Sequence, residues 1–146
     1  MKRPMNQTTW EILDDMFAEA PFMRAEPVEE SEVVEAARVF GFQLPEDYQQ
    51  FVCRYGGATV GPFSIYGLRA ADTMGRNEAS AFEVTKRFRS EGWDGVADAL
   101  VISADHSGNP VYLKPNGEIW ITDHDFGGSS KIAEHFEDYL LNKCLS

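Results

Sequence analysis

Residues 41–57 read GFQLPEDYQQFVCRYGG, and this stretch decides the predicted fold because it holds a complete helix between a proline and two glycines. Pro45 suits the first helical turn, where its missing N–H would have no partner, and the acidic residues beside it favour the helix dipole. Tyr48, Phe51 and Tyr55 recur at helical spacing on one face. At the paired glycines the helix ends, and the apolar period changes from that of a helix to that of a strand.

Two further helices are predicted on the N-terminal side of this stretch. Residues 8–11 have the Thr-x-x-Glu form of a capping box, which supplies partners for backbone donors at a helix start. Leu13 and Phe17 then continue one apolar face. The second helix is predicted to begin near Val28 and to end at Gly41.

Short β-prone segments separated by turn formers fill most of the remaining chain. The predicted strands are 58–60, 63–66, 100–104, 110–113 and 118–122. Asn116 and Gly117 form the strongest hairpin signal, because both residues accept positive φ. Residues 70–93 interrupt the strands with a polar and weakly helical pattern, so we expect a partly exposed helix or an excursion from the sheet.

The C-terminal region is predicted to be a helix. We expect Ser129 and Ser130 to cap it, with Ile132 and Phe136 on its apolar face. Residues 127–130 are interpreted as this cap rather than as a phosphate loop, because they lack the lysine of a P-loop. Helices first, an antiparallel meander next and a closing helix predict one α+β domain over residues 1–146, with helices flanking an antiparallel or mixed central sheet.

The net charge narrows the classes of partner. Thirteen Lys and Arg against 24 Asp and Glu give a formal charge of −11. Such a surface repels phosphate backbones, so we expect no direct binding of nucleic acid. It would attract a basic protein and speed the encounter at low salt, although solubility alone also explains an acidic composition.

Two features predict a cytoplasmic protein. No run of 18 apolar residues occurs, and the basic N-terminus leads into no signal-peptide apolar segment, so no membrane association is expected. The two cysteines, Cys53 and Cys144, stand apart from any metal-ligand spacing and suit a reducing compartment. Cys53 is expected to be packed or half-buried, whereas Cys144 is expected to be exposed, with no histidine nearby in sequence to activate it.

Acidic residues and histidines gather at two predicted strand ends, in Asp105-His106 and in residues 123–125. Carboxylates and imidazoles together can bind a metal or transfer protons. If residues 123–125 are extended, however, both aspartates share one face and His124 points away from them. Asp also forms turns through its own backbone, so we interpret both groups as turns and predict no catalytic residue, no metal site and no cofactor.

Several segments resemble the SMI1/KNR4 family, also called SUKH, and they stand in that family's order over residues 28–142. The segments are 41–48, 55–57, 65–68, 101–105 with 108–111, 117–120 with 123–125, and 132–140. The resemblance implies a six-stranded or similar mixed sheet flanked by helices, and a role in binding proteins. Bacterial members of the family are mostly immunity proteins that neutralise polymorphic toxins, often nucleases; fungal relatives are regulatory scaffolds.

We therefore predict a non-catalytic immunity-type protein that binds a basic toxin domain by an acidic face. The predicted contact residues are Glu91, Trp93, Asp94, Asp105, Asp123 and Asp125, which turns and strand ends would present outward. Trp93 has an alternative reading as a core anchor. A regulatory or scaffold module and, less favoured, an enzyme are the other classes, and the sequence leaves the oligomeric state open.

Overall fold

The structure, a computed structural model, describes residues 3–74, 80–125 and 127–146. The helical elements are α1 (Gln7–Glu19), the 3-10 turn η1 (Pro21–Met23), α2 (Glu30–Phe40), α3 (Glu46–Tyr55), α4 (Ala81–Ser90), α5 (Phe136–Tyr139) and the π-helical turn η2 (Leu140–Cys144). The strands are β1 (Ala58–Val60), β2 (Phe63–Ile65), β3 (Leu100–Ala104), β4 (Pro110–Leu113), β5 (Ile119–Thr122) and β6 (Ser129–Ala133). The predicted α+β class is confirmed.

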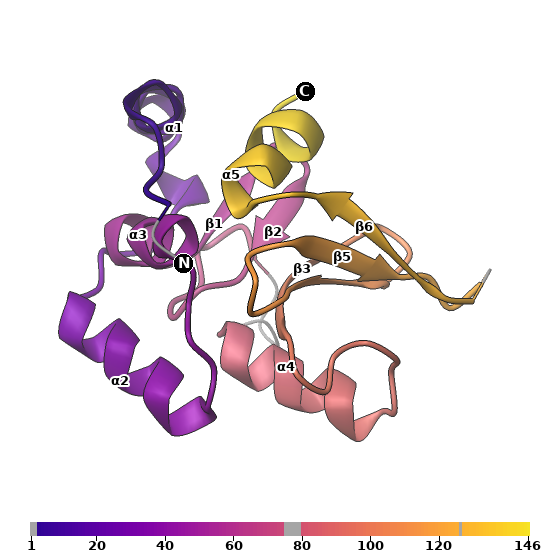
Figure 1. The fold of residues 1–146 in the computed structure, drawn as a ribbon. Helices are drawn as coiled ribbons and strands as arrows, with labels where there is room; N and C mark the ends of the chain where they lie inside the picture. Colours follow the sequence, from indigo (N-terminus) through magenta and orange to yellow (C-terminus); the bar gives the residue numbers. More distant parts are fainter. Residues whose placement is uncertain (1–2, 75–79, 126) are drawn as a thin grey trace.

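The strands form two antiparallel sheets that lie side by side. β1 and β2 make a hairpin, and β3-β4-β5-β6 make a meander in sequence order. The Tyr66 N–H donates to the Ile102 carbonyl at 2.8 Å, and the Ser103 hydroxyl donates to the Ser64 carbonyl at 2.7 Å, so the hairpin abuts the β3 edge. In Figure 1 the meander lies between α5 above and α4 below, with α1, α2 and α3 on the left.

The predicted helix of residues 41–57 is α3, and it supplies much of the core. Tyr48, Phe51 and Tyr55 are all buried, and the Phe136 ring of α5 packs edge-on against Tyr48 and Phe51 with centroids 5.1 and 5.3 Å apart. Pro45 precedes the first helical residue instead of lying in the first turn. The helix ends at Gly56 as predicted.

The start of α1 corrects the predicted capping box. Thr8 lies inside the helix, and the residue at the N-cap is Asn6. The Asn6 N–H donates instead to the Glu137 carboxylate at 3.0 Å, and the Thr9 hydroxyl donates to the same carboxylate. The backbone N–H at the start of the helix is therefore bound by Glu137, 131 positions away in sequence, whereas the capping-box pattern predicted Glu11 as its acceptor.

The predicted excursion of residues 70–93 contains α4, while residues 75–79 of it lie outside the described residues. Ser80 caps the helix by accepting the Glu83 N–H at 3.1 Å. Thr85 accepts the Val101 N–H at 2.8 Å and so joins α4 to β3. α4 is the predicted partly exposed helix, with one face buried and the other open to solvent.

The predicted C-terminal helix starts too early. Residues 129–133 form strand β6, in which Ser129 pairs with Thr122, so Ser129 and Ser130 do not cap a helix. α5 begins only at Phe136. The preceding glycines at 127–128 have positive φ and lie in the hairpin turn from β5 to β6. The serines carried a cap signal, but pairing with β5 outweighs it.

Replacing Glu137 by Gln should lower the free energy of unfolding by about 1–3 kcal/mol, because a buried charged acceptor of hydrogen bonds from Asn6 and Thr9 is lost. Urea unfolding measures this. Glu134→Gln is the matched control: Glu134 is exposed and pairs with Lys131 at the surface, so it should change stability by less than about 1 kcal/mol. Equal losses for the two variants would contradict the role given to Glu137.

Candidate functional site

The six predicted contact residues come together at one end of the meander. They lie in three connections: the loop from α4 to β3, the turn from β3 to β4, and the turn from β5 to β6. We call this surface the acidic turn face; its members are Glu91, Trp93, Asp94, Asp105, Asp123 and Asp125, joined by Asn109 and His124. In Figure 1 the β5–β6 turn projects at the right of the molecule, with the loop after α4 below it.

Asn109 joins the two turns. It is buried, and its side-chain amide N donates to the Asp105 carboxylate at 2.9 Å. Its side-chain oxygen accepts the His124 backbone N–H at 3.1 Å and lies 2.6 Å from His124 Nδ1. Sequence reasoning missed Asn109, because its partners are 4 and 15 positions away and no local motif marks it.

Both turns are also held by their own aspartates, as predicted. Asp105 accepts the backbone N–H groups of Ser107 and Asn109, each at 2.9 Å. Burial opposes ionisation of Asp105, but hydrogen bonds from Asn109 and Ser107 outweigh it, so its pKa lies below the ordinary value. Asp123 accepts the Asp125 N–H at 2.9 Å. The carboxylates thus have a structural task and remain at the surface as negative charge.

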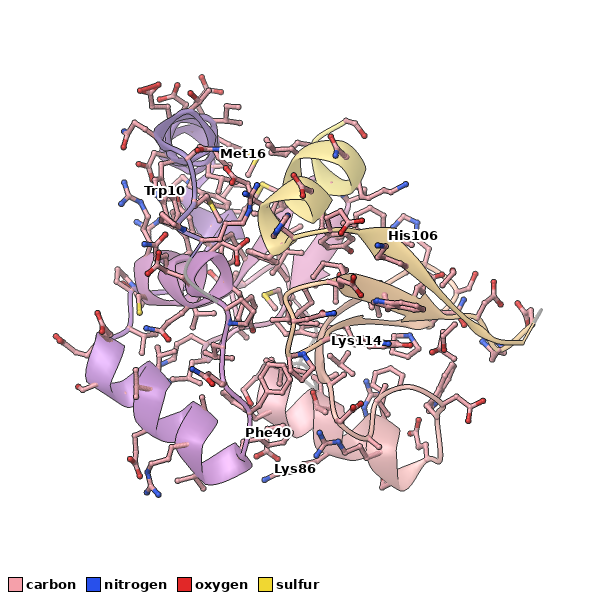
Figure 2. All side chains as sticks on the ribbon, in the orientation of Figure 1. Trp10, Met16, Phe40, Lys86, His106 and Lys114 are labelled. Atoms are coloured by element: carbon pink, nitrogen blue, oxygen red, sulfur yellow. The ribbon has the colours of Figure 1, made fainter. Side chains whose placement is uncertain are left out.

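His124 contacts an aspartate of its own turn. In an extended segment its ring would point away from the aspartates, but residues 123–125 form a turn, as predicted, and His124 Nε2 lies 3.1 Å from an Asp125 oxygen. His106, in contrast, is not part of the cluster. Its ring (labelled in Figure 2) stacks on Phe63 of β2 with centroids 5.1 Å apart.

Trp93 connects the third segment to the face. Its ring meets His124 edge-on with centroids 5.4 Å apart and packs in the same manner on Phe88 of α4. Its Nε1–H donates to Glu91 at 3.2 Å. Trp93 is only half-buried, so it both anchors the loop and contributes an apolar contact to the surface.

The loop that carries Trp93 and Asp94 is held close to the sheet. The Asp94 carbonyl accepts a hydrogen bond from the Thr122 hydroxyl at 2.9 Å. The Asp94 carboxylate is exposed and takes part in none of the described contacts that hold the loop. Gly95 follows with φ of +87°, and a Cβ at this position would collide with the Tyr112 hydroxyl. Glycine is therefore required here for both its conformation and its small size.

The cysteines offer no reactive nucleophile. Cys53 is half-buried, as expected, and burial raises the pKa of its thiol. Cys144 was expected to be exposed but is buried, because the η2 turn folds its backbone against Gly61 in the β1–β2 turn. Burial raises the Cys144 pKa to about 12, so this thiol stays protonated at neutral pH.

The described part of the chain holds no candidate metal cluster and no membrane-spanning helix. No group of three or more His, Cys, Asp or Glu side chains that could hold a metal occurs within residues 3–74, 80–125 and 127–146. The same part of the chain contains no helix with the length and hydropathy needed to cross a bilayer. A groove of about 590 Å³ between α2 and α3 is lined by Val34, Phe42 and Leu44 among others, and its lining shares no residue with the acidic turn face.

The fold and this surface define a class: a small α+β domain whose candidate site is a negatively charged contact surface. A comparison with protein families matches residues 27–142 to the SMI1 / KNR4 family (SUKH-1). The chain belongs to this family, as the resemblance indicated. A search of curated proteins returns no match.

Asn109→Ala should destabilise the protein by about 1–3 kcal/mol, because it removes the buried side chain whose hydrogen bonds join the two turns. It should also speed amide exchange at His124, whose N–H loses its acceptor. Asn116→Ala is the control: Asn116 accepts one N–H, from Glu118, in an exposed turn, and should cost less than about 1 kcal/mol. If both variants lose the same stability, Asn109 is not what joins the turns.

Proposed function

We propose that this chain is an immunity-type protein that neutralises a basic toxin domain by direct binding, without catalysing a reaction. The observation that carries the proposal is the acidic turn face. It gathers carboxylates from three connections around a half-buried tryptophan, on a chain with a formal charge of −11. Membership of the SMI1 / KNR4 family (SUKH-1) supports a role in binding proteins.

The arrangement suits recognition of a basic surface. Rim carboxylates steer a positively charged partner and raise the association rate at low salt. A tryptophan ringed by polar groups is a common centre of binding energy. Because Asn109 holds the turns through its hydrogen bonds to Asp105 and with His124, little conformational entropy is lost on binding.

Inhibition would follow from occlusion of the partner's active site. A toxin that acts on nucleic acid presents cations to phosphate, and the carboxylates of the acidic turn face would occupy the same cations. The decisive experiment identifies the genes that neighbour this chain's gene and expresses a basic toxin domain encoded there, with and without the chain. Growth restored by the chain, together with a purified complex, supports the proposal, whereas a chain that binds a cellular regulator and restores no growth supports a scaffold.

Asp94→Lys should lower the association rate with that toxin domain several-fold at low salt and flatten its salt dependence, because the exposed carboxylate is replaced by a cation. Glu19→Lys is the matched control, since it changes net charge equally at the end of α1, which Figure 1 places away from the β5–β6 turn. Stopped-flow association at two salt concentrations measures both. Equal effects of the two variants would show that net charge, and not this face, directs binding.

A further inference from the structure

The ring of His124 has a hydrogen-bond acceptor at each of its nitrogens. Nδ1 lies 2.6 Å from the side-chain oxygen of Asn109, and Nε2 lies 3.1 Å from a carboxylate oxygen of Asp125. A neutral imidazole carries one N–H and can donate to only one of these acceptors, whereas an imidazolium carries two. The identity of both acceptors therefore decides the protonation of the ring.

The orientation of the Asn109 amide is fixed by its other partners. One end lies 2.9 Å from an Asp105 carboxylate oxygen, and a carboxylate only accepts, so this end is the amino group. The opposite end accepts the His124 backbone N–H at 3.1 Å and is therefore the oxygen. His124 Nδ1 faces that oxygen and must carry a proton.

The contact with Asp125 requires a second proton. A carboxylate oxygen facing an unprotonated Nε2 would oppose one lone pair to another, so the observed contact at 3.1 Å needs Nε2–H as well. We propose that His124 is a pH-sensitive clasp, in which protonation of its ring ties Asp125 and Asn109 together and deprotonation releases Asp125. Imidazole is the side chain whose ordinary charge change falls between about pH 5 and 8, which sets the range over which the clasp is to be tested.

The charged groups that face His124 come from each connection packed around it. Asp123 and Asp125 belong to its own turn, and Asp105 acts through Asn109 from the β3–β4 turn. In the loop after α4, the Trp93 ring contacts the imidazole, and its Nε1–H donates to the Glu91 carboxylate. Asp94 follows Trp93 in the same loop. These named groups are carboxylates, the counterions that an imidazolium pairs with.

Deprotonation has a defined outcome, because the two nitrogens are not equivalent. The Asn109 oxygen can only accept, so the remaining proton stays on Nδ1 and the contact with Asn109 persists. Nε2 loses its proton, and the carboxylate of Asp125 turns away from the ring. The Asp125 N–H keeps its bond to Asp123, so the change is confined to one side chain at the centre of the acidic turn face.

NMR titration of the isotopically labelled full chain between pH 5 and 8 tests this without any partner. The ring nitrogens of His124, the side-chain amide of Asn109 and the carboxylate carbon of Asp125 should shift with one common midpoint, above which the protonated fraction falls about tenfold per pH unit. At high pH the proton should remain on Nδ1. An Asp125 signal that ignores the His124 titration, or a high-pH proton on Nε2, would overturn the proposal.

Two variants and a control sharpen the test. His124→Gln keeps a donor for Asn109 but does not titrate, so the pH response of Asp125 in this range should be lost. Asp125→Asn can either accept from or donate to Nε2, so His124 should still titrate while residue 125 stays in place, which keeps the test valid if the first variant folds poorly. His106→Gln, in the neighbouring turn, should leave the Asp125 response intact. Loss of that response in the control would contradict the assignment to His124.

Discussion

The burial of two carboxylates, on Asp47 and Glu137, is the constraint on which the arrangement of the helices depends. The Asp47 carboxylate of α3 accepts a hydrogen bond from the Glu137 N–H at the start of α5. The Glu137 carboxylate in turn accepts hydrogen bonds from the Asn6 N–H and the Thr9 hydroxyl at the start of α1. Burial raises the pKa of Asp47, and hydrogen bonds from the backbone oppose that shift. Buried carboxylates without such donors would be costly, so the three helices must meet in this one geometry.

The acidic turn face lies at the other end of β6 from this helical anchor. α5 and α3 interlock through Phe136, whereas the turns at the acidic turn face carry few apolar side chains and depend on polar contacts. A sheet with short, hydrogen-bonded connections holds charged loop residues in place, so little conformational entropy is lost when they bind. The same carboxylates accept backbone N–H groups within the turns and still contribute negative charge to the surface.

Much of the fold could be predicted from local patterns. α3, the β1–β2 hairpin and the three strands around Asn116 and Gly117 follow from apolar periodicity and turn chemistry, which act between near neighbours in the chain. Local patterns failed where a distant partner decided the outcome. Ser129 and Ser130 form a strand because β5 pairs with them, and α1 is capped by Glu137 rather than by its own residues.

The sequence by itself determined the order of the elements as far as β5, the acidic charge and the residue types gathered at the strand ends, because composition and periodicity are local properties. Only the tertiary structure decided that Asn109 and His124 join three connections, that His124 meets Asp125, and that Cys144 is buried. These outcomes depend on which turns the sheet register brings together. The spacing of Asn109, His124 and Asp125 along the chain does not indicate that their side chains form hydrogen bonds with one another.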